Sequence, residues 1–365
     1  MSISNSNSVA NNRLASLDFF RGFTMFILIG SVLYELMRES DNAFINKIGW
    51  QLEHQYWHGL SLWDFVEPFF MFIVGVAIPF SVMNRLEKGD SWNAIFKHVL
   101  KRSVILFFLG VFIYSVSAGK PAWKLWNVLT QLSLTSFVAF LLMRKPIPIQ
   151  LSVSFLLLLI SELLYRFWAV EGYHQPFTEA QNFGSWIDMK LMGQLEGDNW
   201  VAFNVVPTTA FTIWGVIAGL ILRSKRTYQL KLKILICAGL VGVVAGFALD
   251  PITPMIKRIA TSSIIIETGG WCLIMLAFCY WLVDIKKVTK IPNFFAIVGL
   301  NSLFIYLFEQ LGGVSLLSRL AQPFSYALLF WSGSSGVAYG TAILSWFLMW
   351  YICYWLYKYK IFIKI

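Results

Sequence analysis

Two histidines and two carboxylates form the most concentrated group of reactive side chains in this sequence. His54 and His58 lie four residues apart in a polar segment, and Asp64 and Glu67 follow at the start of an apolar stretch. A carboxylate at membrane depth costs about 2.5–3.5 kcal/mol, so it seldom occurs there without a partner or a task. An imidazole titrates near neutral pH and suits a general base, and an Asp within reach orients its ring. We therefore predict that His54 is a general base held by Asp64; the alternative is that His54 is only an amphipathic side chain at the membrane surface.

The two histidines would supply half of a metal site if they lay on one helix, because they are one helical turn apart. No HExxH pattern is present, and Glu53 precedes the first histidine instead of following it. We therefore expect no metal. The sequence also contains no Walker A, GxGxxG or GxSxG pattern, so none of these phosphate-binding or nucleophile motifs is available.

The composition defines the elements that must position these residues. The chain has 365 residues, of which 58% are hydrophobic and only 13% are charged, and long apolar windows recur from end to end. These figures exclude an ordinary soluble domain and predict an all-α, polytopic membrane protein, a helical bundle in a lipid bilayer. The formal charge of +10 would suit nucleic acid. The basic residues cluster in short loops between apolar spans, however, so we expect no nucleic-acid partner.

About ten membrane spans are expected from the apolar windows. Lys and Arg are concentrated in the loops on the side of the N-terminus, which predicts that both termini are cytoplasmic and that His54 faces the outside. We also expect a disordered tail over residues 1–12 and a single transmembrane domain over residues 13–365. The expected spans lie near residues 17–37, 60–84, 103–117, 127–143, 149–170, 205–222, 233–249, 262–284, 293–311 and 336–356.

The first expected span opens with two opposite charges. Asp18 and Arg21 are three residues apart and therefore share a helical face. One interpretation is a structural ion pair at the cytoplasmic end of the span. The other is that Arg21 also contributes positive charge to a phosphate site.

Several blocks of this sequence resemble the heparan-α-glucosaminide N-acetyltransferase family of transmembrane acyltransferases and its bacterial relatives. The blocks occur in the family's order and cover most of the expected spans, and their combination is more specific than any one of them. They are RLASLDFFRG (13–22), HQYWHGLSLWDFVEPFFMFIVGVAIPFS (54–81), NVVPTTAFTIWGVIAGLIL (204–222), KRIATSSIIIETGGWCLIMLAFCYWLVD (257–284) and FAIVGLNSLFIYLFEQL (295–311).

The resemblance implies an enzyme that takes acetyl-CoA from the cytoplasm and acetylates an amino sugar, such as a glycan end, on the far side of the membrane. Carried over by motif, the family's catalytic histidine falls on His54, its Asp on Asp64 and the Asn of its ninth span on Asn301. It also implies the bacterial cytoplasmic (inner) membrane, with the active-site segment facing the periplasm or exterior.

On this basis we expect CoA to enter from the inner face and its thioester to reach a cavity beside His54. His54 would act as a general base or carry the acetyl group itself, and Asn301 would stabilise the oxyanion. The residues expected to bind the cofactor are Arg21, Lys101, Arg102 and Arg223. Those assigned to the acceptor are Trp57, His58 and Glu67.

The sequence departs from the family pattern at two places. It reads GSVLY (30–34) where the family often has an Asn, and TQLSL (130–134), with Gln131, where the family tends to have Gln-Arg. The acceptor, the choice between N- and O-acylation and the oligomeric state, a homo-oligomer included, are left open. The alternative function is a proton-coupled sugar or small-solute transporter, against which the lack of a visible internal repeat argues.

Overall fold

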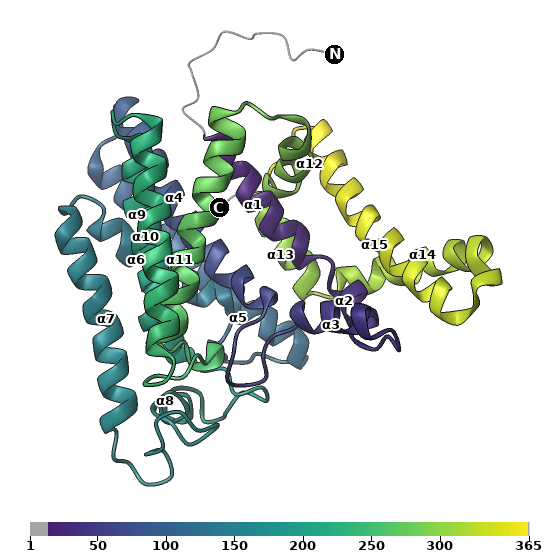
Figure 1. Cartoon of the computed structure of the whole chain (residues 1–365), viewed down its shortest axis with the longest axis horizontal. Helices are drawn as coiled ribbons and strands as arrows, with labels where there is room; N and C mark the ends of the chain where they lie inside the picture. Colours follow the sequence, from purple (N-terminus) through teal and green to yellow (C-terminus); the bar gives the residue numbers. More distant parts are fainter. Residues whose placement is uncertain (1–13, 364) are drawn as a thin grey trace.

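The computed structural model describes residues 14–363 and residue 365, and the tail expected over residues 1–12 lies outside this range. The described part of the chain is helical and contains no β-strand, apart from one isolated bridge between His58 and Ile256. Figure 1 shows long helices that run side by side as a bundle. The prediction of an all-α, polytopic membrane bundle is confirmed.

The helices follow one another without intervening sheet. In chain order they are α1 (Ala15–Leu28), α2 (Ser31–Arg38), α3 (Ala43–Gln51), the 3-10 turn η1 (Leu62–Phe65), α4 (Val66–Glu87), α5 (Trp92–Ala118), α6 (Val128–Leu142), α7 (Ile147–Phe167), α8 (Phe183–Met192), η2 (Ala202–Asn204), α9 (Val205–Arg223), α10 (Tyr228–Leu249), η3 (Lys257–Ile259), α11 (Ser262–Cys279), η4 (Tyr280–Ile285), α12 (Lys290–Gly299), α13 (Ser302–Gln310), α14 (Gly313–Leu329), η5 (Phe330–Ser332) and α15 (Gly333–Lys358).

Each of the expected spans coincides with a helix or with a bent pair of helices. Among the described residues, seven helices are long and apolar enough to cross a membrane. The pairs α1–α2 and α12–α13, bent by 50° and 60°, raise that number to nine if each pair is one span. The remaining expected span, α6, has only 15 residues. Length and composition therefore support up to nine spans, one fewer than the sequence suggested.

Segments far apart in the chain meet at each end of the bundle. At one end Arg223, the last residue of α9, pairs with Glu87, the last residue of α4, and the guanidinium of Arg144 lies 4.8 Å from the centre of the Trp92 ring. At the opposite end, below the helices in Figure 1, lies α8 with its flanking segments. This arrangement separates a basic end from an end that carries the His54 segment.

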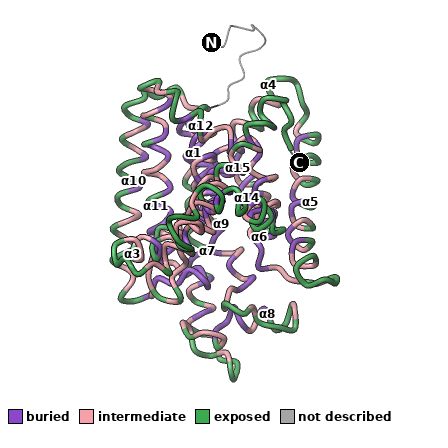
Figure 2. Tube along the Cα trace, turned by 90° about the vertical axis from the view of Figure 1, so that its right-hand side faces the viewer, coloured by how far each residue is buried: buried purple, intermediate pink, exposed green. Residues whose placement is uncertain are grey.

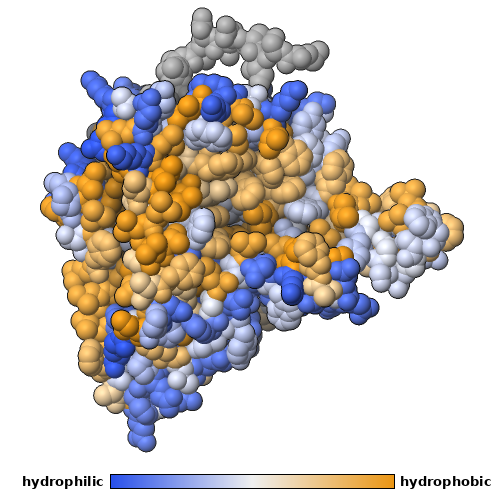
Figure 3. Space-filling view, viewed as in Figure 1, coloured by the Kyte–Doolittle hydropathy of each residue, from blue (hydrophilic) through white to orange (hydrophobic). Residues whose placement is uncertain are grey.

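Close helix crossings depend on glycine. At the crossing of α4 and α9, a Cβ placed on Gly75 would lie 2.2 Å from the carbonyl oxygen of Thr212, and one on Gly215 would lie 2.2 Å from that of Phe72. Small residues of this kind let backbones approach in a bilayer, where packing replaces the hydrophobic effect. The resulting core is purple in Figure 2, with α5 and α10 exposing green outer faces. On the face seen in Figure 3, the surface is apolar over the middle of the bundle and polar toward both ends.

Candidate active site

His54 and Asp64 form a hydrogen-bonded pair at the start of the second expected span. Asp64 is fully buried in η1, and its Oδ2 accepts hydrogen bonds from the N–H and the hydroxyl of Ser61, each at 2.9 Å. This is the usual reciprocal cap of a helix start, in which an acidic side chain reaches back to the first residue. The cap leaves Oδ1 free to accept from His54, whose Nδ1 lies 2.7 Å away. Local helix-capping chemistry therefore fixes the carboxylate that orients the ring.

The pairing defines which nitrogen of His54 can do chemistry. Because ionised Asp64 only accepts hydrogen bonds, the proton of the neutral ring belongs on Nδ1 and the lone pair on Nε2. Nε2 has no hydrogen-bond partner in the described part of the chain, and the side chain is 29% exposed. Trp63 and Trp200 meet the ring edge to face, at centroid distances of 6.3 and 5.1 Å. Asp64, Trp63 and Trp200 therefore hold the imidazole ring in position, while the ring remains partly exposed.

His54 lines a cavity of about 270 Å³, which we call the outer cavity. Its walls combine aromatic rings with a few amides, a lining typical of sites for small polar ligands. Glu67 also lines it. The other polar or aromatic lining residues are Trp63, Phe70, Tyr114, Trp126, Asn127, Gln131, Trp200, Tyr306 and Gln310.

One buried carboxylate outside the bundle holds two parts of the outer-cavity wall. Asp188 of α8 accepts a hydrogen bond from Trp126 Nε1 at 2.6 Å through Oδ2, and one from the N–H of Ala202 at 2.9 Å through Oδ1. Burial raises the pKa of Asp188 to about 7, with Glu196 adding to the rise and the two hydrogen bonds opposing it. The segment from residue 171 to 204 thus positions Trp126 and the loop that carries Trp200.

Glu67 is neutralised by a lysine from a distant part of the chain. Its Oε2 lies 2.7 Å from Nζ of Lys257, and the two side chains are only 18% and 5% exposed. The pair joins the first turn of α4 to η3. The negative charge of Glu67 on the outer cavity is therefore compensated by Lys257.

The structure places the other two residues assigned to the acceptor away from the outer cavity. Trp57 Nε1 donates to the carbonyl oxygen of Phe177 at 2.8 Å. His58 Nε2 lies 2.9 Å from Asp250 Oδ1. Burial favours a higher pKa for Asp250, but the hydrogen bonds from His58 and from the N–H of Met255 lower its pKa below the ordinary value. Neither Trp57 nor His58 lines the outer cavity, because both are used to fasten loops to one another.

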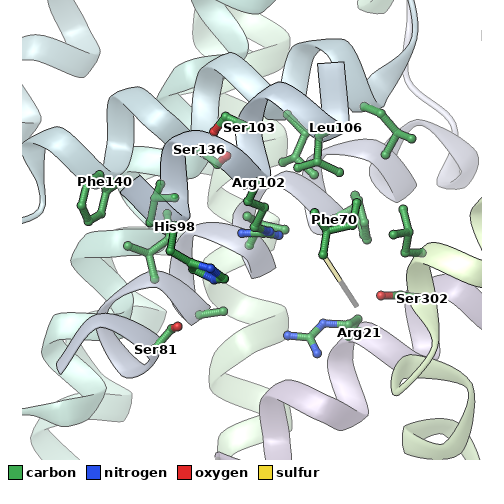
Figure 4. A pocket seen from close by; sticks show the side chains of 18 of the residues that line it. Arg21, Phe70, Ser81, His98, Arg102, Ser103, Leu106, Ser136, Phe140 and Ser302 are labelled. Carbon is green, nitrogen blue, oxygen red and sulfur yellow. The ribbon is translucent and has the colours of Figure 1, made fainter. Parts of the chain in front are cut away.

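A second cavity, of about 360 Å³, lies toward the basic end of the bundle, and we call it the inner cavity. Arg21 and Arg102 reach into it from α1 and α5, and Figure 4 shows both guanidinium groups and the ring of His98 facing the same space. Arg21 lies 3.4 Å from Asp18, which confirms the predicted ion pair. Four serine hydroxyls complete the polar lining: Ser81, Ser103, Ser136 and Ser302.

Two of the expected cofactor residues do not reach the inner cavity. Lys101 is exposed on the surface of α5. Arg223 donates to Asn84 Oδ1 at 2.9 Å and pairs with Glu87. Both remain at the basic end of the bundle, but Arg21 and Arg102 alone of the four line the cavity.

Asn301 is not brought to His54. It is fully buried at the break between α12 and α13. Its Nδ2 donates to the carbonyl oxygen of Ile361 at 3.1 Å, and its Oδ1 accepts from the N–H of Ile363 at 2.9 Å. Asn301 therefore fastens the segment that follows α15 beside the inner cavity, where Ile363 is part of the lining.

The inner and outer cavities share one lining residue, Phe70 of α4. The ring of Phe70 is 8% exposed. Val128 lines the outer cavity and its neighbour Leu129 lines the inner one. The two cavities therefore adjoin at Phe70, with Arg21 and Arg102 on one of them and His54 on the other.

Sequence reasoning missed most of the outer-cavity wall. Asn127 and Gln131 stand four residues apart at the start of an apolar helix, a polar face that would have pointed to them. Trp126 and Tyr306 carry no such signal, because aromatic residues are frequent throughout this chain.

Comparisons with known proteins bear on the family resemblance seen in the sequence. Residues 13–169 match a family described as a domain of unknown function, DUF5009. The heparan-alpha-glucosaminide N-acetyltransferase of Mus musculus is 30% identical over 148 residues, which are 38% of this chain and 20% of the mouse protein. The Homo sapiens protein of the same name is 31% identical over 147 residues, 37% of this chain and 20% of the human protein. The matches thus span about a fifth of these relatives. The family resemblance predicted from the sequence is confirmed at this level: the N-terminal part of the chain matches DUF5009, and just over a third of the chain is similar to the heparan-alpha-glucosaminide N-acetyltransferases of mouse and human.

Proposed function

We propose that this protein is a membrane-embedded acetyltransferase that moves an acetyl group from acetyl-CoA at the inner cavity to an amino sugar at the outer cavity. The observation that carries the proposal is the His54–Asp64 pair on a cavity that backs directly onto a basic one. The activity named for the mouse and human relatives supports the same reaction class.

The donor would bind with its phosphates at Arg21 and Arg102. Guanidinium groups match phosphate oxygens in geometry and charge, and the serine hydroxyls of the inner cavity add donors. The pantetheine arm of CoA is long and thin, so it would pass the Phe70 position while the charged nucleotide stays behind. Among the described residues, no group of three or more His, Cys, Asp or Glu is placed to hold a metal ion.

The acceptor would bind against the aromatic walls of the outer cavity. Trp63, Trp126 and Trp200 offer flat apolar faces to the C–H face of a sugar ring, and Asn127 and Gln131 offer polar groups to its hydroxyls. This lining suits a glucosamine-type end of a glycan.

In the reaction, the amine of the acceptor attacks the thioester carbonyl carbon. His54 Nε2 takes a proton from the amine as the C–N bond forms, and Asp64 stabilises the imidazolium. When the C–S bond breaks, the proton passes to the CoA thiolate, so the products are free CoA and an N-acetyl sugar. The competing route forms an acetyl-imidazole on His54 first.

The distribution of Lys and Arg supports a cytoplasmic inner cavity and an outer cavity that opens to the periplasm or exterior of a bacterial cytoplasmic membrane. The transfer would then carry an acetyl group across the bilayer without carrying CoA.

The test is labelled acetyl-CoA supplied to the inner face of proteoliposomes, with glucosamine outside. Wild type should release labelled N-acetylglucosamine outside, and His54→Ala should lose at least 100-fold in rate. His58→Ala is the matched control, because His58 pairs with Asp250 and lies off both cavities, and it should retain activity. Equal product from wild type and His54→Ala would remove His54 from the mechanism. A labelled acetyl group that stays on the protein in a single turnover without acceptor would select the acetyl-imidazole route.

A second candidate function is a proton-coupled sugar transporter, since two cavities that meet at one residue are also an arrangement for alternating access. CoA release that requires both acetyl-CoA and the amino sugar would exclude it. Uptake of unmodified sugar without acetyl-CoA would favour it.

A further inference from the structure

The outer cavity contains an amide whose donor group has no protein partner. Asn127 precedes α6 and is 5% exposed. Its Oδ1 accepts hydrogen bonds from the N–H of Leu129 at 2.8 Å and from the hydroxyl of Tyr306 at 3.3 Å. Both partners are donors, so the network assigns oxygen to this position and the NH₂ group to the other.

The NH₂ group of Asn127 is therefore left for the cavity. It makes no hydrogen bond to any residue in the described part of the chain, while Asn127 as a whole lines the outer cavity together with His54. A side chain this buried normally satisfies its donors. A donor that faces a cavity without a partner is a place where a ligand acceptor fits.

The start of α6 adds a second source of positive potential. Val128 and Gln131, in the first turn of α6, line the same cavity as Asn127. The N–H groups of Leu129 and Gln131 both donate to Asn127, so what the first turn contributes is the positive end of the helix dipole. The Asn127 donor and the helix start thus act on the same small volume.

The other buried or cavity-lining amides considered for this role, those of Asn301, Gln310 and Gln131, have partners for their NH₂ groups. Both polar atoms of Asn301 are engaged with residues 361 and 363. Gln310 Nε2 donates to Glu309 at 2.6 Å, and Gln131 Nε2 is directed to the carbonyl oxygen of Trp126 at 3.5 Å.

We propose that Asn127 is a further catalytic residue, whose Nδ2, aided by the first turn of α6, binds the thioester carbonyl oxygen during transfer. The inference rests on the acetyltransferase function proposed above. When the acceptor amine attacks, the carbonyl π electrons move onto oxygen, and Nδ2–H stabilises that oxyanion. The C=O bond re-forms as the C–S bond breaks, so Asn127 exchanges no proton and returns unchanged.

Asn127→Asp is the sharpest test. Asp retains the oxygen that caps α6 and accepts from Tyr306, and Asp is as good an N-cap as Asn. It replaces the donor by a negative charge that repels the oxyanion. We expect kcat to fall by about 10²–10³, the usual effect of losing one such donor, with little change in the KM for acetyl-CoA or in the melting temperature. Asn127→Ser, which keeps a cap without adding charge, should lose at least tenfold in kcat.

Asn42→Asp is the matched control. Asn42 caps α3 through the same atom, accepting from the N–H groups of Phe44 and Ile45, and it lies on neither cavity. It should retain wild-type kcat.

The outcomes separate the two proposals. An active wild type with an equally active Asn127→Asp would refute the role of Asn127 and leave the acetyltransferase standing. A melting temperature that falls together with activity in both Asn127 variants, or a raised KM with unchanged kcat, would assign Asn127 to folding or to ground-state binding and also overturn the proposal. A wild type that makes no acetylated product would overturn the acetyltransferase itself, and the role of Asn127 with it.

Discussion

Replacing Asp64 by Asn tests whether the carboxylate determines which ring nitrogen of His54 carries the proton. In the native site Oδ2 accepts from Ser61 at 2.9 Å and Oδ1 lies 2.7 Å from His54 Nδ1. Asn has only one acceptor oxygen, and the N–H of Ser61 requires it. The NH₂ group then faces His54, so the ring must accept at Nδ1 and carry its proton on Nε2. The lone pair that faces the outer cavity is lost.

The expected loss in kcat is about 10³–10⁴, which corresponds to about 4–5.5 kcal/mol of transition-state stabilisation. The same exchange in a Ser-His-Asp triad, where the Asp also fixes a tautomer, costs about 10⁴. The folded protein should be retained, because Asn matches Asp in shape and keeps the bond to Ser61. A loss of stability would come only from the weaker contact to His54.

The assay is CoA release under saturating acetyl-CoA and glucosamine, over a range of pH, with melting temperatures of the same preparations. Asp250→Asn is the control, because Asp250 forms a second carboxylate–imidazole pair, with His58, at the protein surface. This substitution should leave kcat unchanged. An Asp64→Asn enzyme that is folded and within tenfold of wild type would show that the pair does not set the tautomer of a catalytic base.

Three further changes test other parts of the site. Burial raises the pKa of Asp188 from 3.8 to about 7, so between these values the folded protein retains a proton that the unfolded chain has released. The contribution of Asp188 to stability should therefore be present at acid pH and fall by about 3 kcal/mol as the pH rises from 4 to 7. A melting temperature of Asp188→Asn with the same pH slope as that of wild type would contradict this. Phe70→Ala should join the two cavities, so CoA release without acceptor should rise several-fold in proteoliposomes; a rate equal to that of Phe70→Leu would show that Phe70 is not the partition. Arg102→Ala should raise the KM for acetyl-CoA about tenfold through loss of a charged contact, whereas Arg223→Ala, which lies off the inner cavity, should not; equal effects would place the phosphates elsewhere.

The helices were predictable because a span needs a continuous apolar segment, and such segments are visible in one dimension. The breaks within α1–α2 and α12–α13 were not, because they depend on neighbouring helices that re-satisfy the freed backbone groups. The pairing of His54 with Asp64 was predictable for a local reason. Asp64 caps its own helix start, and ten residues of chain bring the histidine back to it.

The wall of the outer cavity was not predictable, because it is made by contacts between segments far apart in the chain. Asp188 and Trp126 are 62 residues apart. Asn301 is a second example: its place in a family motif suggested a role at the oxyanion, and in the structure its amide donates to the carbonyl oxygen of Ile361, 60 residues later. No local pattern reports either contact.

The ion pair between Glu67 and Lys257 has a consequence for the choice of acceptor. Glu67 is held at 2.7 Å from the ammonium group of Lys257 and so offers no uncompensated charge to a positively charged guest, while Asp64 is fully buried behind His54 and does not line the outer cavity. An alkylammonium ion would thus leave water without a counter-charge, which is unfavourable. The free-base form of an amine avoids that loss, so the protein should prefer acceptors whose nitrogen is weakly basic. Amino sugars, in which neighbouring oxygens withdraw electron density from the nitrogen, meet that requirement better than simple alkylamines.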